Sequence, residues 1–270
     1  MRSDTNNVVR VAAIGDLHYG RNATAGSLQP LFGQINDSAD VLAICGDLTD
    51  FGLAEEARAL TRELTVIKIP IVGVLGNHDF ESSQQNEIRS ILADNGVTIL
   101  DGDSAEILGI GFAGIKGFAG GFGRRALGPW GEDIIKKFVH EAVDEALKLE
   151  SALARLRNDK RIALLHYSPI QETVEGEPLE IYPFLGCSRL EEPLGRYPVT
   201  AVFHGHAHHG RPEGRTTKGV PVFNVSMSLM SALYPERPFR LIHIDMTTPS
   251  DERRAGSERR MTVVSGGDRS

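Results

Sequence analysis

Five apolar segments of this chain each lead directly into Asp, Asn or His, and this recurrence restricts the fold more than any other feature. Each segment is short and apolar, as a buried strand is. In open α/β sheets, ligand-binding and catalytic groups gather at the carboxyl ends of the strands, where loops leave a crevice. One such strand end is common, but five of them predict a single site. The segments and the polar residues that follow them are Val9 to Ile14 with Asp16 and His18, Val41 to Cys45 with Asp47 and Asp50, Ile69 to Leu75 with Asn77 and His78, Ile162 to Leu165 with His166, and Val199 to Phe203 with His206 and His208.

Helical segments separate several of these strands. Helices are predicted over 27–36, 53–66, 84–94 and 132–157, and the second of them is rich in the strong helix formers Ala, Leu, Glu and Arg. Residues 97–100 and 105–110 are predicted to form a strand and a hairpin around Gly102-Asp103-Ser104, and 220–225 and 239–244 are predicted as closing strands. This order of elements predicts an α/β fold with one large core.

A chain of 270 residues lies near the upper end for one domain, so we expect a single domain over 1–246. Two long connections, 116–160 and 169–198, are predicted to be insertions or a cap near the site. The second contains five prolines, and connections of this length in a compact domain are usually functional. The composition of 247–270, rich in Arg, Ser, Gly, Asp and Glu, predicts a disordered tail.

The glycine-rich stretch from Gly117 to Gly123 has two interpretations. It can be a flexible loop, because glycine loses more conformational freedom on folding than other residues. It can also bind phosphate at the start of a helix. The stretch lacks the Lys-Ser/Thr ending of a P-loop, which favours the flexible loop.

The overall charge excludes some classes of function. A net charge of −7 argues against general binding to nucleic acids or membrane surfaces. Two cysteines, Cys45 and Cys187, indicate no disulfide framework and suit a reducing compartment. There is no apolar run of transmembrane length, and Met1 to Asn7 is too polar for a signal peptide. We therefore expect a cytoplasmic protein, while the oligomeric state stays open.

Seven side chains at the strand ends have the chemistry of metal ligands. Imidazole nitrogens combined with carboxylate and amide oxygens suit Mn, Fe or Zn, and the absence of cysteine argues against a structural zinc site. Seven donors are too many for one tetrahedral ion but suit two ions that share a carboxylate. Alternate residues of an extended segment point the same way, so the pairs 16/18 and 206/208 can each face one cluster. The candidate ligands are Asp16, His18, Asp47, Asn77, His166, His206 and His208.

Each of these residues alone has an ordinary structural explanation. Asp16 could cap a helix, Asn77-His78-Asp79 could form a turn, and the histidines from His204 to His209 could lie in a solvated loop. Independent structural causes would not place every one of these groups at a strand end. Their joint occurrence therefore favours a dinuclear metal site.

The ordered set of motifs resembles the calcineurin-like metallophosphoesterases. The resemblance covers about residues 10 to 210, and all five parts occur in the order found in that family. It implies a four-layer α/β/β/α sandwich with a dimetal site at one edge, at the carboxyl ends of the strands. The motifs are Asp16-Leu17-His18, Gly46-Asp47-Leu48-Thr49-Asp50, Gly76-Asn77-His78-Asp79, His166 and Gly205-His206-Ala207-His208.

The resemblance also implies a role for each residue. The site would hold two divalent ions or a mixed-valence pair. Asp16, His18 and His208 would bind the first ion, Asn77, His166 and His206 would bind the second, and Asp47 would bridge them. His78 would face the phosphate as the general acid, and Asp50 matches the position that can orient this histidine. His204 and His209 would lie around the ligands or at the surface. A hydroxide that bridges the ions would attack phosphorus, and no covalent phosphoenzyme is expected.

The sequence favours phosphodiesters over phosphomonoesters as substrates. A monoester carries about two negative charges near neutral pH, and enzymes usually meet that charge with arginines. The phosphoprotein phosphatases of this family carry an arginine where this chain has Phe51. Asp79, where those phosphatases carry Glu, resembles the diesterase branch that includes the class III cyclic-nucleotide phosphodiesterases. Arg124 and Arg125 would weaken this argument if their loop folds over the site.

The favoured hypothesis is therefore a metal-dependent phosphodiesterase acting on a small substrate such as a cyclic nucleotide. One alternative is a phosphomonoesterase or phosphoprotein phosphatase on the same fold. Another is a scaffold that keeps the fold without the reaction. Such scaffolds tend to lose ligands or the phosphate-facing histidine, and this chain retains all seven ligands and His78.

Overall fold

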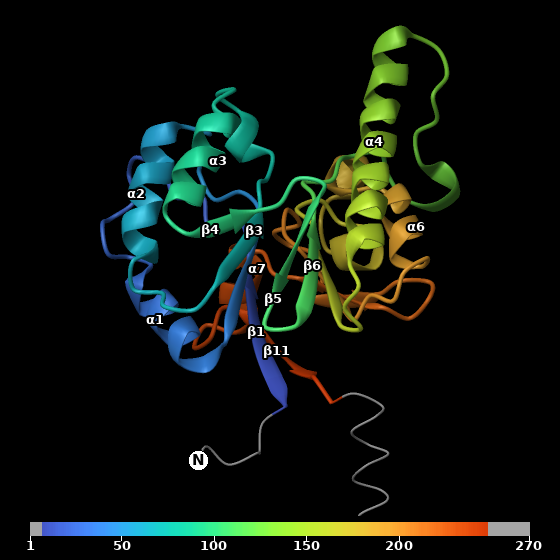
Figure 1. Cartoon of the computed structure of the whole chain (residues 1–270). Coiled ribbons are helices and arrows are strands. Elements are labelled where there is room, and N and C mark those ends of the chain that lie inside the picture. Colours follow the sequence, from blue (N-terminus) through green and yellow to red (C-terminus); the bar gives the residue numbers. More distant parts are fainter. Residues whose placement is uncertain (1–6, 248–270) are drawn as a thin grey trace, which may run out of the picture.

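Successive side chains of strand β1 (Val8–Ile14) point to two different apolar layers. Val11 and Ala13 pack among the side chains between two sheets, whereas Ala12 and Ile14 pack among side chains from helices. Side chains on a strand alternate between faces, so a strand that is apolar on both faces must be covered on both. The computed structural model describes residues 7–247, and Figure 1 shows the layered arrangement that results.

The described residues form two sheets, and most neighbouring strands within each are parallel. β11, β5 and β9 are antiparallel to their neighbours and lie at sheet edges. In spatial order, the first sheet contains β11 (Arg240–Asp245), β1, β2 (Val41–Cys45), β3 (Ile71–Val74) and β4 (Val97–Ile99). The second contains β5 (Asp103–Ile107), β6 (Ile110–Gly114), β7 (Arg161–Leu164), β8 (Ala201–His204), β10 (Pro221–Asn224) and β9 (Glu213–Arg215).

Helices cover the outer face of each sheet, on opposite sides of the molecule in Figure 1. Phe32, Leu60 and Leu92 fill the layer between the first sheet and its helices, and Leu149 and Leu153 pack against the second sheet. The expected four-layer α/β/β/α sandwich is thus confirmed. The helices are α1 (Gln29–Ser38), α2 (Ala54–Leu64) and α3 (Gln85–Asp94) on the first sheet, α4 (Asp133–Arg155) on the second, and α7 (Met227–Leu233), which sequence analysis did not identify.

The β-hairpin lies farther along the chain than expected. Its two strands, β5 and β6, are joined at Leu108-Gly109, and both of these residues have positive φ angles, 51° and 80°. Leucine rarely adopts that conformation, so Gly109 was the only turn signal there and was weaker than Gly102-Asp103-Ser104. Gly102 instead lies where the chain passes from β4 in the first sheet to β5 in the second.

The two long connections pack against each other. Gly120 N–H donates to the Pro183 carbonyl at 2.7 Å, and Gly121 N–H donates to the Gly186 carbonyl at 2.9 Å. These N–H groups are therefore occupied within the protein and do not form a phosphate cradle. The second connection contains the short helices η3 (Glu172–Val174), η4 (Leu179–Ile181), α5 (Tyr182–Leu185), η5 (Ser188–Leu190) and α6 (Glu191–Leu194), and the first contains η2 (Gly123–Arg125).

Apart from Thr247, the expected tail lies outside the described residues. Within 7–247, none of the helices combines the length and the apolar character needed to cross a membrane. Cys45 and Cys187 are both buried as free thiols.

Candidate metal centre

Loops that follow β1, β2 and β3 bring carboxylate, amide and imidazole groups to one edge of the sandwich. Asp16 N–H donates to the Gly46 carbonyl at 2.9 Å, and His18 N–H donates to the Asp47 carbonyl at 3.0 Å, so the first two loops are held together. Asp16, His18, Asp47 and His206 all have left-handed φ angles, of 56°, 43°, 48° and 70°. Such backbone conformations concentrate at functional sites, where the surroundings hold them in place.

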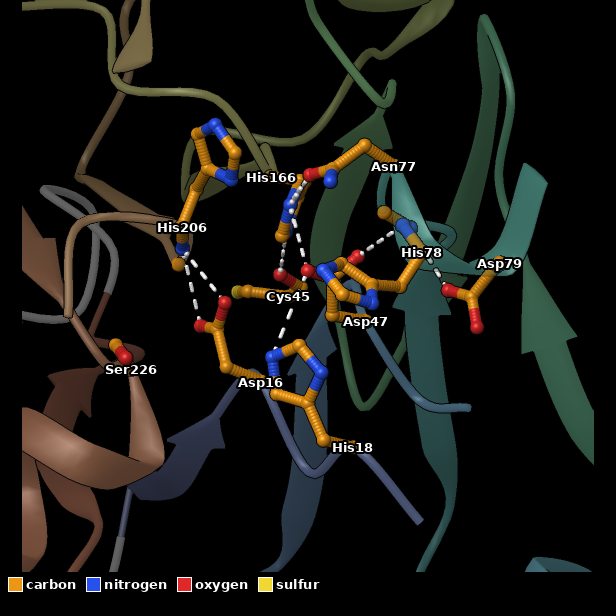
Figure 2. A network of polar contacts seen from close by, with 12 residues as sticks. Asp16, His18, Cys45, Asp47, Asn77, His78, Asp79, His166, His206 and Ser226 are labelled. Carbon is orange, nitrogen blue, oxygen red and sulfur yellow. Dashed lines mark hydrogen bonds and ion pairs between the residues drawn. The ribbon is translucent and has the colours of Figure 1, made fainter. Parts of the chain in front are cut away.

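The structure brings all seven predicted ligands together as two groups on either side of Asp47, and Figure 2 labels all of them except His208. The Asp16 group consists of Asp16, His18 and His208, whose donor atoms lie within 4.8 Å of one another. The Asn77 group consists of Asn77, His166 and His206. One ligand atom each of His166, His206 and the central Asp47 lie within 4.8 Å of one another. Asn77 Oδ1 lies 2.8 Å from His166 Nε2.

Asp47 is placed between these groups. Its Oδ2 lies 3.7 Å from His18 Nε2 on one side and 3.4 Å from His166 Nε2 on the other. Its Oδ1 accepts a hydrogen bond from the His78 N–H at 2.8 Å. Burial alone would raise the pKa of Asp47, but the imidazole of His166 outweighs it and holds this pKa well below the usual value. The carboxylate is therefore anionic and central.

In both histidines of the Asn77 group, protein oxygen fixes one ring nitrogen. His166 Nδ1–H donates to the Cys45 carbonyl at 2.9 Å, which turns Nε2 toward Asn77 and Asp47. His206 Nε2–H donates to the Phe184 carbonyl at 3.2 Å, which leaves Nδ1 with its lone pair free. Metal-binding histidines usually have their second nitrogen held in this way.

The charges of these imidazoles differ. Burial opposes protonation of His166, but Asp47 outweighs it and raises the pKa of His166 to about 9. Burial, with the neighbouring His166, lowers the pKa of His206 to about 3. The hydrogen bond to Asp16 raises the pKa of His208, whereas burial lowers that of His18. A metal ion needs neutral imidazoles, so it would take the place of the proton on His166 Nε2.

Two buried atoms of the site fit a cation directly. His18 Nε2 and Asp47 Oδ2 have no hydrogen-bond partner among the described residues. A buried polar atom without a partner is uncommon and costs free energy. Both atoms are electron-pair donors of the kinds that bind Mn, Fe and Zn. The donor set therefore fits metal ions, with Asp47 Oδ2 accessible to both groups.

His78 is fixed mainly by a main-chain carbonyl. Its Nδ1–H donates to the carbonyl oxygen of Asp50 at 2.6 Å, so Nε2 is the nitrogen available for proton transfer. The Glu81 carboxylate lies farther from the same Nδ1, at 3.7 Å. The Asp50 carboxylate instead lies 3.6 Å from His18 Nδ1. The rings of His18 and His78 meet edge to face, 4.5 Å between centroids. Asp50 thus contacts two histidines through different atoms.

Asp79 is a structural residue of the loops. Its carboxylate accepts hydrogen bonds from Leu48 N–H, Thr49 N–H, Thr49 Oγ–H and Gly76 N–H, at 2.6 to 3.2 Å. Burial and the nearby Asp47 raise the pKa of Asp79 to about 6, whereas these donors favour the ionised form. Asp79 is fully buried, and its carboxylate holds two loops together.

The remaining histidines of the last motif lie apart from the ligands. His204 is fully buried, and its Nε2 lies 2.8 Å from Thr173 Oγ1. His209 is exposed. A side chain at Gly205 would collide with Asp16, and one at Gly76 would collide with Asp47, which explains why glycine precedes ligands at these two positions.

Sequence analysis missed the contacts made by main-chain carbonyls. The carbonyls of Cys45, Asp50 and Phe184 each fix a histidine, and no residue type signals such a role. It also missed Tyr167, whose ring packs on that of His206 with 4.4 Å between centroids. Its position directly after His166, at the end of β7, was a visible signal.

Comparison with known families gives a match over most of the chain. A family model described as calcineurin-like phosphoesterase matches residues 9–210. Among curated proteins, the "Probable glycerophosphodiester phosphodiesterase GpdQ" of Arcobacter nitrofigilis is 24% identical over 182 residues, which cover 63% of this chain and 56% of that protein. The alignment thus spans little more than half the length of this relative.

Solved structures share the fold at low sequence identity. Phosphopantetheinyl hydrolase from Mycobacterium tuberculosis superposes with a TM-score of 0.61 at 16% identity, covering 88% of this chain and 96% of that one. A purple acid phosphatase from yellow lupin (Lupinus luteus) seeds gives a TM-score of 0.52 at 15% identity, covering 82% and 44%. At these identities the likeness shows the fold alone.

Proposed function

Because the chain belongs to the calcineurin-like phosphoesterase family and is a hydrolytic enzyme of that family, we propose that it hydrolyses small phosphodiesters with two metal ions. The observation that carries the proposal is the pair of donor groups that meet at Asp47, where Asp47 Oδ2 and His18 Nε2 have no hydrogen-bond partner within residues 7–247. The Asp16 group would hold one ion, the Asn77 group the other, and Asp47 would contact both. Mn, Fe and Zn are the candidate metals.

Each part of the site has a chemical task. When bound, the ions supply positive charge to the phosphate oxygens and lower the pKa of a nearby water molecule. His78 keeps its Nδ1 proton on the Asp50 carbonyl and would donate an Nε2 proton to the leaving oxygen. An alkoxide is a poor leaving group at neutral pH, so this proton matters most for alkyl esters.

The lack of arginine around the site supports a diester rather than a monoester. Among residues 7–247, no arginine forms an ion pair or a hydrogen bond with a side chain of the seven ligands or His78. The side chain after Asp50 is Phe51, half of which is exposed. Arg124 and Arg125 are exposed in η2. A diester carries one negative charge fewer than a monoester dianion and so needs fewer cations.

The proposal extends to the setting of the reaction. We infer that the substrate is a small molecule, because every ligand lies on one short edge of the sandwich. The name of the Arcobacter relative, a probable glycerophosphodiester phosphodiesterase, is compatible with a small phosphodiester as the substrate. A cytoplasmic location is part of the proposal and rests on the two free cysteines, which suit a reducing compartment.

The test is a comparison of kcat/KM for bis(4-nitrophenyl) phosphate and 4-nitrophenyl phosphate, with one metal and one pH for both. The purified protein is first reconstituted with Mn, Zn, Fe, Co or Ni. We expect the diester value to be the higher one. A monoester value tenfold or more above it would overturn the diester assignment. Arg124→Ala combined with Arg125→Ala would then show whether η2 supplies the charge.

A further inference from the structure

Lys116 is a partly buried cation beside the metal centre, and no carboxylate of the described residues forms an ion pair with it. Burial lowers its pKa, whereas the carboxylates of Glu145, Glu141 and Asp101 act on it only through their charge and favour its protonated form. Its Nζ lies 5.5 Å from the ring centre of Phe80, 5.0 Å from that of Phe118 and 5.4 Å from that of Tyr167. Among the described residues its hydrogen bond runs only to its neighbour, the Gly117 carbonyl, at 2.8 Å, and it takes part in no ion pair. A Lys ammonium has three N–H donors, and the Gly117 carbonyl accepts from one of them, so this ammonium can still donate to an anion.

The fold ties Lys116 to the centre. It follows the carboxyl end of β6, between β5 and β7 in the second sheet, and its carbonyl accepts hydrogen bonds from the N–H groups of His166 and Tyr167, at 3.0 and 3.1 Å. Tyr167 lies between Lys116 and the Asn77 group. Its ring centre is 4.4 Å from that of His206 and 5.4 Å from the Lys116 Nζ. Lys116 is therefore about one side chain away from the Asn77 group.

A small cavity of about 100 Å³ opens beside Lys116. Phe80, two residues after His78, forms part of its wall, and so do Gln85, Arg89 and Asp101. Asp101 is already paired, 3.9 Å from Arg89 and 3.4 Å from Lys148. The buried Oε1 of Gln85 has no hydrogen-bond partner among the described residues. This volume is well above the roughly 10 to 15 Å³ that one water molecule needs, so the cavity has room for a carboxylate-sized group.

We propose that Lys116 binds a second anionic group, carried by one of the two organic substituents of the phosphodiester. This inference rests on the proposed diesterase function and adds a substrate class to it. The phosphodiester would occupy the metal centre, the substituent would run along the Tyr167 ring, and its anionic end would meet the ammonium. Lys116 would thereby select doubly anionic diesters over singly charged ones.

Two aryl diesters with the same leaving group test this proposal. They are 4-nitrophenyl phenyl phosphate and 4-carboxyphenyl 4-nitrophenyl phosphate, which differ by one carboxylate. A hydrogen bond between charged groups is roughly twice as strong as a neutral one, so we expect Lys116→Met to raise KM for the carboxylated diester by about tenfold or more. KM for the phenyl diester should change less than about twofold, and Lys116→Arg should restore the preference.

Lys148→Gln is the matched control, because it removes a nearby positive charge that is already bonded to Glu145 and Asp101. It should leave the ratio of the two KM values unchanged. If Lys116 only supports the packing of the aromatic rings, Lys116→Met will lower Tm and affect both diesters equally. Equal changes in KM for the two diesters in Lys116→Met would overturn the proposal. So would a loss of the preference for the carboxylated diester in Lys148→Gln as large as that in Lys116→Met.

Calorimetric titration of both diesters into the metal-loaded protein separates this proposal from the diesterase function. Hydrolysis of the phenyl diester with no carboxylate preference would keep the function and refute the role of Lys116. Tighter binding of the carboxylated diester that is lost in Lys116→Met, without hydrolysis of either compound, would keep the role of Lys116 and refute the function. Equal affinities without hydrolysis would refute both.

Discussion

The two ligand groups around Asp47 differ in how firmly the protein holds them. In the Asn77 group, His166 is fully buried and has both ring nitrogens engaged, and His206 is fixed by a main-chain carbonyl. In the Asp16 group, the side chains of His18 and His208 are 23% and 36% exposed. A preorganised ligand set loses less conformational freedom when it binds. The Asn77 group should therefore hold its ion more tightly, while the Asp16 group should exchange its ion more readily.

Asp47→Ala should affect both groups of ligands. This substitution removes the carboxylate placed between both groups, so we expect metal content to fall in both and hydrolysis to approach background. Elemental analysis after reconstitution measures the stoichiometry, which should be two in the unmodified protein. A stoichiometry of one or less in the unmodified protein, unchanged in Asp47→Ala, would contradict the shared-ligand assignment.

His78→Ala should reduce the rate without affecting either group of ligands. A general acid contributes roughly a hundred- to ten-thousandfold, and the loss should shrink for nitrophenolate, which needs little protonation. Rates for an alkyl and a nitrophenyl diester, with metal content as the control, measure this effect. Equal losses for both leaving groups would mean that His78 binds phosphate without transferring a proton.

Single-ligand variants should each weaken the binding of one ion. His18→Ala should lose mainly the ion of the Asp16 group, and His166→Ala mainly that of the Asn77 group. We expect the unmodified protein, titrated with a chelator, to release its two ions at clearly different chelator concentrations. His18→Ala should retain the late-released ion, and His166→Ala the early-released one. Simultaneous release of both ions from the unmodified protein would show that the difference in burial has no effect on affinity.

Asp50→Asn should have a smaller effect, and on one group. Because the carbonyl of Asp50 holds His78, that contact survives the substitution, while the carboxylate beside His18 Nδ1 is lost. Changing a residue that supports a ligand typically costs about 10- to 100-fold in metal affinity or activity. We expect weaker binding of the early-released ion. A rate loss that is larger for poor leaving groups than for nitrophenolate, as expected for His78→Ala, would instead mean that the Asp50 carboxylate orients His78.

Asp79→Asn should have the smallest effect on the reaction. It disturbs buried hydrogen bonds, which we expect to cost about 1 to 3 kcal/mol of stability, or very roughly 2 to 4 °C in Tm per kcal/mol. Both ions should still bind, and the ratio of diester to monoester hydrolysis should not change. A shift of that ratio toward monoesters would mean that Asp79 contributes to the preference for diesters.

The strands and ligands at the edge of the sandwich could be predicted from the sequence, but the contacts that hold these ligands in place could not. The apolar segments that precede Asp16, Asp47, Asn77 and His166 were visible as strands, because burial on both faces leaves a continuous apolar run. The hairpin turn at Leu108 was misplaced, because a left-handed leucine has no sequence signature. Local pattern also could not reveal that residue 184 reaches a histidine 22 positions away through its carbonyl, since any amino acid supplies that group.

The left-handed conformations at Asp16, His18, Asp47 and His206 have an evolutionary consequence. A residue in a sparsely populated backbone region costs of order 1–3 kcal/mol, and glycine would avoid most of that cost. A descendant that stopped using metals would therefore be free to become more stable by accepting glycine at these positions. Relatives that have given up the reaction should therefore carry glycine at some of these four ligand positions. Among active relatives, the same four positions keep a local cost in stability, which better packing of the core can offset but not remove.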